Sequence, residues 1–192
     1  IFVFVHGGYW NSLDKADFSY VAEGMAAHGV TTVVNNYALA PDVGMDEIVR
    51  QNRAAFAWLW EHGRDYGADP SRIYACGHSA GGHLVAMMMA TDWPRFDDRT
   101  PALPKNLIKG GCGISGLYDL EPIRLCFLND DLGLSPAEAG RNSPLRCHKY
   151  RHTIRRPDVQ QQPGHIGPER IRVAHRTRRP SIPTFRTMNL SR

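Results

Sequence analysis

The stretch that decides the fold lies in the middle of the chain and reads IYACGHSAGGHLVAMMMA, residues 73–90. It begins with a short, mostly apolar run typical of a strand and ends with residues that favour a helix. Between the two lies the pattern G-x-S-x-G, from Gly77 to Gly81. A serine on a tight turn from strand to helix is held with its hydroxyl exposed, and small neighbours let the turn close. We therefore predict that Ser79 is a nucleophile, with an ordinary glycine turn as the alternative.

A second glycine motif stands near the start of the chain. Residues 1–5 are apolar and predict a buried strand, and the sequence then continues as His6-Gly7-Gly8-Tyr9-Trp10. Paired glycines adopt backbone angles that other residues avoid, so the motif predicts a tight loop after this strand. A glycine turn with a chance histidine is the alternative. The presence of Ser79 some 70 residues later favours a functional loop.

Strands and helices alternate over the first part of the chain. The apolar and β-branched runs predict strands at residues 1–5, 30–34, 72–76 and 106–115. Apolar residues at helical spacing predict helices from residue 18 to 29, from 48 to about 63 and from 82 to 90. This alternation predicts an α/β fold with a mostly parallel sheet and helices on both faces. Sites in such sheets lie at the carboxyl ends of the strands, where His6, Ser79 and Ser115 fall.

Charge is distributed unevenly along the 192 residues. Residues 1–144 hold 11 Lys and Arg against 17 Asp and Glu, whereas residues 145–192 hold 12 against 2. The overall charge of +4 therefore comes from the last 48 residues and gives no argument for an acidic substrate. The length suffices for one domain with a sizeable core.

Several classes of protein are disfavoured by the remaining composition. The apolar runs are too short for a membrane span. No cluster of His, Cys, Asp or Glu has metal-ligand spacing, so we expect no metal or cofactor. The four cysteines show no C-x-x-C spacing, which favours reduced thiols in the cytoplasm, and Cys76 and Cys112 fall in strands that we expect to be buried. The chain has no initial Met and no visible signal peptide, so we expect it to begin inside a longer protein.

Taken together, the two glycine motifs resemble the kynurenine formamidase (arylformamidase) branch of the α/β-hydrolase superfamily. Residues 36–41, 115–120 and 128–132 support the resemblance, which extends from residue 1 to about Pro144. Related esterases usually carry a third glycine after His-Gly-Gly, and Tyr9 stands there instead. The resemblance implies an α/β-hydrolase fold, incomplete here at both ends, and a Ser–Asp–His triad without metal.

The resemblance also implies roles for the motif residues. Ser79 attacks the carbonyl, and backbone N–H groups of Gly7, Gly8 and Ala80 form the oxyanion hole. Tyr9 and Trp10 form an aromatic wall for the substrate or, as an equal alternative, pack in the core or the loop. The implied reaction is hydrolysis of N-formylkynurenine-like formamides or small esters, a small-molecule substrate class. A carboxylesterase of the same superfamily and a non-catalytic fragment are the alternatives.

The resemblance ends where the family continues with two more strands, which carry the catalytic Asp and His. Residues 145–192 contain five prolines and no strand-like run of four, so we expect them to be disordered. A native basic tail that binds nucleic acid or an anionic membrane is one interpretation. We favour the other, a shift of reading frame or a truncation near residue 145, with no specific nucleic-acid site and no membrane partner. The predicted partial core is therefore residues 1–144.

The remaining triad candidates are weak. Four histidines, His148, His152, His165 and His175, lie in the tail and are not expected to act as the base. We expect His6, His78 and His83 to have structural roles and Asp119 to be a helix cap or a loop residue. The chain as given is thus predicted to lack the triad Asp and His and to show little turnover.

Overall fold

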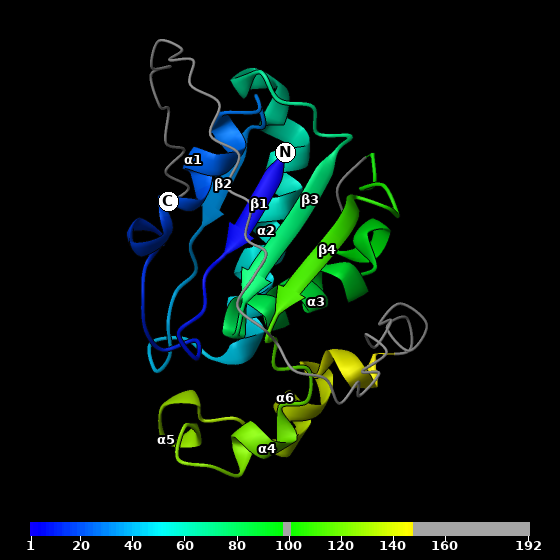
Figure 1. Ribbon diagram of the computed structural model, residues 1–192. Coiled ribbons are helices and arrows are strands. Elements are labelled where there is room, and N and C mark those ends of the chain that lie inside the picture. The colour runs from blue at the N-terminus through cyan, green and yellow to red at the C-terminus, as the bar shows by residue number, and fades with distance from the viewer. Residues whose placement is uncertain (98–100, 148–192) are drawn as a thin grey trace, which may run out of the picture.

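One parallel sheet organises the molecule. The computed structural model describes residues 1–97 and 101–147, and in this part of the chain the sheet has the strand order β2-β1-β3-β4 (Figure 1). Its strands are β1 (Phe2–Val5), β2 (Thr32–Asn35), β3 (Ile73–His78) and β4 (Ile108–Ile114). All three neighbouring pairs are parallel. The four strands expected from sequence are confirmed, with small shifts at their ends.

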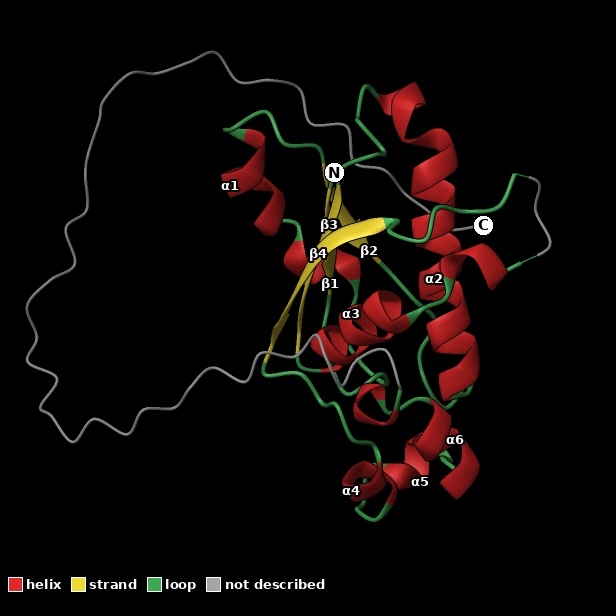
Figure 2. Cartoon of the chain, turned by 90° about the vertical axis from the view of Figure 1, so that its right-hand side faces the viewer, coloured by secondary structure: helices red, strands yellow, loops and turns green. Residues whose placement is uncertain are grey.

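Helices cover both faces of this sheet, as the alternating pattern predicted. They are α1 (Val21–Ala26), α2 (Met45–His62) and α3 (Ala80–Ala90). Seen edge-on, the sheet has α1 on one side and α2 with α3 on the other (Figure 2). Short 3-10 helices precede or follow them: η1 (Lys15–Phe18), η2 (Gly63–Tyr66) and η3 (Trp93–Arg95). Because each strand is parallel to its neighbours, the carboxyl ends of all four point to one edge.

The core lies between the sheet and the pair α2 and α3. Helix α2 is amphipathic, and its buried residues include Ile48, Asn52, Phe56 and Leu59. Helix α3 is buried along nearly its whole length, because it is packed against β3 and β4 on one side and α2 on another. Such a helix is apolar all round, which the run from Leu84 onward reflects.

Strand β4 differs from the expectation of a buried strand. Only Ile108 at its start is buried; Cys112 is exposed, and Cys76 on the adjacent strand β3 is only partly buried. The prediction that both cysteines lie in buried strands is therefore wrong. Strand β4 is the last strand of the sheet within residues 1–97 and 101–147, and the face that carries Cys112 is not covered by α3.

A third group of short helices lies beyond the carboxyl ends of the strands (Figure 1). These are α4 (Glu121–Arg124), α5 (Asn129–Leu132), α6 (Pro136–Arg141) and η4 (Pro144–Arg146). The predicted tail, residues 145–192, lies outside the described residues from residue 148 onward. None of the helices that the structure describes combines the length and the apolar character that a membrane span requires.

Candidate active site

Ser79 stands on a strained turn between β3 and α3. Its backbone angles are φ 54° and ψ −117°, a combination that residues with a side chain rarely adopt. The Ser79 N–H donates to the Ile114 carbonyl at 2.8 Å, and the Ser79 carbonyl accepts from the His83 N–H at 3.1 Å. The residue is half-buried. Contacts to β4 and to α3 therefore fix the serine in the geometry that the sequence predicted.

Close backbone approach explains the glycines around this turn. A Cβ on Gly81 would lie 2.0 Å from the Val5 carbonyl oxygen, and a Cβ on Gly77 would lie 2.3 Å from the Gly81 oxygen. No side chain fits at either place without moving the backbone. The turn consequently rests directly on the end of β1, the strand from which the other glycine motif departs.

The His6–Trp10 loop passes next to Ser79. A Cβ on Gly7 would stand 3.3 Å from the Ser79 Cβ and 2.8 Å from the His78 carbonyl oxygen, which places Gly7 against the turn. Gly8 has φ 103°, and a Cβ there would lie 2.2 Å from the Ser12 carbonyl oxygen. The fold thus brings together two motifs that are about 70 residues apart in sequence.

Tyr37 orients the peptides of this loop, a role that the sequence analysis missed. Its hydroxyl donates to the carbonyls of His6 and Gly7, at 3.0 and 3.3 Å. In a trans peptide the N–H points opposite to the C=O, so the N–H groups of Gly7 and Gly8 point away from Tyr37. Burial raises the pKa of Tyr37, which keeps the phenol protonated and able to donate. The position of Tyr37 just after β2, at the carboxyl edge of the sheet, was the sequence signal that could have indicated this role.

His6 is a structural residue of the loop. It is fully buried, its Nδ1 donates to the Gly7 carbonyl at 2.8 Å, and its Nε2 lies 3.0 Å from Asn36 Oδ1. The ring stacks between Tyr37 and Phe18, with centroid distances of 4.4 and 5.8 Å. These contacts hold the start of the loop and agree with the local role that the sequence predicted.

His83 and Trp10 form a buried pair behind the turn. The Trp10 Nε1–H donates to His83 Nδ1 at 3.2 Å, so Nδ1 carries no proton, and His83 Nε2 donates to the Asn142 carbonyl at 2.7 Å. Burial lowers the pKa of His83 to about 4, against the opposing effect of the Asn142 carbonyl. His83 is therefore neutral with both nitrogens engaged. Of the two roles left open for Trp10, the structure has the core role, whereas Tyr9 is 45% exposed.

The other triad candidates do not complete a triad with Ser79. His78 is the exposed last residue of β3. Asp119 Oδ1 accepts from the Glu121 N–H at 3.2 Å and lies 3.3 Å from a guanidinium nitrogen of Arg146. The N-cap of α4 is Leu120, so Asp119 is a loop residue, the second of its two predicted roles. In residues 1–97 and 101–147, no hydrogen bond joins the Ser79 hydroxyl to an imidazole. The four tail histidines lie outside the described residues.

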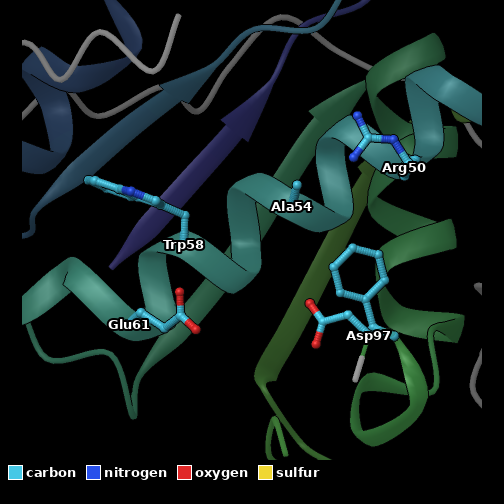
Figure 3. A pocket seen from close by; sticks show the side chains of 6 residues that line it. Arg50, Ala54, Trp58, Glu61 and Asp97 are labelled. Carbon is cyan, nitrogen blue, oxygen red and sulfur yellow. The ribbon is translucent and has the colours of Figure 1, made fainter. Parts of the chain in front are cut away.

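Two other features of the described residues bear on ligand binding. No group of three or more His, Cys, Asp or Glu side chains in this part of the chain could hold a metal ion. A groove of about 370 Å³ lies on the side of α2 that faces away from the strands (Figure 3). Its lining includes Trp58, Glu61 and Asp97. It is not part of the site around Ser79.

A parallel sheet with a serine on a strained turn after β3 and a His-Gly-Gly loop after β1 defines an α/β-hydrolase. Within that superfamily, the chain belongs to the BD-FAE family, whose family model matches residues 1–126. Both motifs and all four strands lie inside the matched region.

Individual relatives agree with this assignment. The chain is 37% identical over 145 residues to kynurenine formamidase from Danio rerio, which covers 75% of this chain and 46% of the relative. A solved structure of a candidate thioesterase from Silicibacter sp. TM1040 is 34% identical, with a TM-score of 0.62 over 76% of this chain and 51% of that one. Esterase 2 from Thermogutta terrifontis, phosphoramylated by tabun, is 26% identical with a TM-score of 0.57, over 76% and 54%. The chain spans about half the length of these proteins.

Proposed function

We propose that the protein is a serine hydrolase of the arylformamidase type, in which Ser79 attacks the carbonyl carbon of an aromatic formamide or a small ester. The observation that carries the proposal is the strained backbone of Ser79, at φ 54°, directly beside Gly7 of the His-Gly-Gly loop. Strained backbone persists where the surrounding structure enforces it, and it gathers at functional sites. Here glycine contacts and two backbone hydrogen bonds supply that enforcement.

Backbone N–H groups supply the electrostatic part of the reaction. Attack by the Ser79 oxygen turns the substrate carbonyl oxygen into an oxyanion. Ala80 is the first residue of α3, and the N–H groups of a first helical turn have no partner inside the helix. The N–H groups of Gly7 and Gly8 point away from Tyr37 and are the other donors of the oxyanion hole. Removing one such donor typically lowers kcat by about 10²–10³-fold.

The base that accepts the Ser79 proton is expected outside the described residues. His6 and His83 are buried with both ring nitrogens occupied. The resemblance to arylformamidases supports an Asp and a His from the part of the relatives that this chain does not match. Residues 1–144 would then be a partial catalytic core. Loss of a triad member costs about 10⁴–10⁶ in kcat.

The substrate class is supported by the relatives and by one exposed ring. The similarity to a kynurenine formamidase supports an aromatic formamide. The exposed ring of Tyr9, on the loop next to Ser79, supplies one wall for such a substrate. The likeness to esterase 2 favours a second candidate, a carboxylesterase that acts on small esters.

A fluorophosphonate probe tests the nucleophile, since esterase 2 is itself phosphoramylated by an organophosphorus compound. In a protein extended to the relatives' length, the probe should label Ser79, and Ser79→Ala should abolish labelling. Ser71→Ala is the matched control, because Ser71 bonds only to Asp69 before β3 begins, and it should label like the parent. If the extended protein is still labelled when it carries Ser79→Ala, Ser79 is not the nucleophile. No labelling at all would favour the non-catalytic alternative.

Turnover separates the two substrate classes and tests the missing base. The extended protein should hydrolyse N-formylkynurenine faster than p-nitrophenyl acetate if it is a formamidase, and the reverse order would favour the carboxylesterase. The 192-residue chain should show little turnover of either compound. Rates of about 1–10³ s⁻¹, ordinary for enzymes, from this chain alone would contradict the missing base.

A further inference from the structure

Cys76 and Cys112 face each other across two adjacent strands. They are register partners in the parallel pair β3 and β4. Neighbouring strands lie about 4.7–4.9 Å apart, and a disulfide usually joins Cα atoms about 4.4–6.8 Å apart. Partners in a parallel pair point to the same face of the sheet. The two thiols therefore meet the first geometric condition for an S–S bond.

Within residues 1–97 and 101–147, the face of β3 and β4 that carries these thiols is exposed. A Cβ on Gly111 would lie 2.9 Å from Met89 Cγ on α3, so Cys112, the next residue, points to the opposite face. Tyr74 and Ile114, which share this face, are 46% and 48% exposed. Cys112 is exposed and Cys76 is partly buried, and neither is oxidised in the structure. A small oxidant in solution can therefore reach Cys112 directly.

The two thiols also interact with each other. The pKa of Cys76 is raised, first by burial and then by the charge of Cys112 and a hydrogen bond with its thiol. Tyr118, whose hydroxyl donates to the Gly113 carbonyl at 3.2 Å, has a pKa raised by burial and then by Cys112. The other cysteines have local partners instead: Cys126 Sγ lies 3.2 Å from the Ile123 carbonyl oxygen, and Cys147 Sγ lies 3.8 Å from that of Ser143.

We propose that Cys76 and Cys112 are an oxidation site, at which hydrogen peroxide closes an intramolecular disulfide between β3 and β4. The exposed Cys112 thiol loses its proton and the thiolate attacks the peroxide, the O–O bond breaks, and Cys112 becomes a sulfenic acid while the departing hydroxide takes up that proton and leaves as water. The Cys76 sulfur then attacks the Cys112 sulfur, the S–O bond breaks, and hydroxide leaves as water with the Cys76 proton. Two thiols and one peroxide thus give one disulfide and two waters.

The position of the site gives the oxidation a structural effect. Cys76 lies three residues before Ser79 in the sequence, and the Ser79 N–H is bonded to the carbonyl of Ile114, two residues after Cys112. The disulfide would tie together the two strands on which the turn rests. It closes a loop of more than 30 residues, and such a closure raises the thermal midpoint of a domain of this size by roughly 5–10 °C.

Thiol mapping tests the proposal on the 192-residue chain. The protein is treated with hydrogen peroxide, free thiols are alkylated with iodoacetamide, and peptides are identified by mass spectrometry. We expect a Cys76–Cys112 peptide pair that lacks two hydrogen atoms, reversal by dithiothreitol, and a higher thermal midpoint. Cys126 and Cys147 should remain alkylated. With Cys76→Ser, Cys112 should stop at a sulfenic acid that dimedone traps.

The control variants keep the proposal falsifiable. Cys126→Ser should form the disulfide at an unchanged rate, and Cys112→Ser should leave Cys76 alkylated after the same treatment. A disulfide between Cys112 residues of two chains, a pairing with Cys126, or independent oxidation of both thiols to sulfinic acid would each overturn the proposal. So would dimedone trapping of Cys112 that is equal in the parent and in Cys76→Ser.

Discussion

Two regions meet near Ser79, and they are held in different ways. The turn between β3 and α3 rests on backbone atoms: an added Cβ at Gly81 would lie 2.0 Å from the Val5 carbonyl oxygen. The segment from residue 117 to 147 buries Leu120, Leu132 and Leu134 in the core and is further held by side-chain hydrogen bonds. Ser143 Oγ accepts from the Leu120 N–H at 2.9 Å and donates to the Ala139 carbonyl at 2.6 Å, and Arg141 pairs with Asp46 of α2.

The two regions therefore tolerate different kinds of substitution. Backbone atoms cannot move aside without shifting a strand, so the turn admits one residue type at its close contacts. A side-chain hydrogen bond contributes about 0.5–1.5 kcal/mol net, so single losses in the second region are smaller. Substitutions should therefore fall into a steep series that begins at the turn and ends at the surface of α6.

The largest effect is expected at the turn. Gly81→Ala should destabilise the protein by about 4 kcal/mol or more, because the new methyl group overlaps two backbone oxygens of β1 and its following residue. Urea unfolding measures the change. Gly24→Ala is the control: Gly24 lies inside α1, and an added Cβ would have no atom within 4 Å beyond the neighbouring residues and backbone of its own helix, so this change should stabilise by about 0.5–1 kcal/mol. Equal changes in the free energy of unfolding for Gly81→Ala and Gly24→Ala would contradict the special role of close backbone contacts at the turn.

The next effect links the two regions, because His83 of α3 donates to Asn142. An unfolded histidine has a pKa of about 6.5, and that of folded His83 is about 4. As the pH falls from 6.5 to 4, the unfolded chain takes up a proton that folded His83 does not, so the free energy of unfolding falls by about 3 kcal/mol. His83→Gln keeps one acceptor and one donor and should lose this part of the pH dependence. Unfolding free energies with the same slope in both proteins would contradict the assignment.

A smaller effect is expected at Ser143, inside the second region. Ser143→Ala leaves the Leu120 N–H and the Ala139 carbonyl without their buried partner and should cost about 1–3 kcal/mol. Thermal unfolding is the measurement. Ser19→Ala, at an exposed hydroxyl that bonds only to the Ala16 carbonyl, should change stability by less than about 0.5 kcal/mol. A loss at Ser143 no greater than at Ser19 would refute the role of this hydroxyl.

The smallest effect is expected at Arg141. The pKa of Asp46 is lowered, chiefly by its hydrogen bonds with Arg141, and Arg141→Ala should return that pKa toward its usual value. NMR titration of Asp46 follows the change. Both side chains are about half exposed, so the loss of stability should be only about 0.5 kcal/mol and should shrink at 1 M salt. A large loss that salt does not reduce would instead indicate that the pair is buried.

The features that the sequence predicted are those encoded by neighbouring residues. Gly77 and Gly81 predicted the turn because a tight strand-to-helix connection restricts residue size locally. Tyr37 and Asn142 were missed because they act through contacts with residues 30 and 59 positions away, which leave no periodic signal. The exposure of Cys112 was missed for a related reason: whether a strand is buried depends on what covers it, and an apolar run does not reveal this.

The strand order makes the neighbourhood of Ser79 a late product of synthesis. Strand β1 pairs with β3, some 70 residues further along the chain, and the bond from Ser79 to Ile114 must wait for the end of β4. At about 5–20 residues per second, a ribosome needs roughly 4–14 s to make the stretch between β1 and β3. Throughout that interval β1 has no partner on its β3 side, and its unpaired edge is exposed to aggregation. The length of this interval follows from the separation of the two glycine motifs in the sequence.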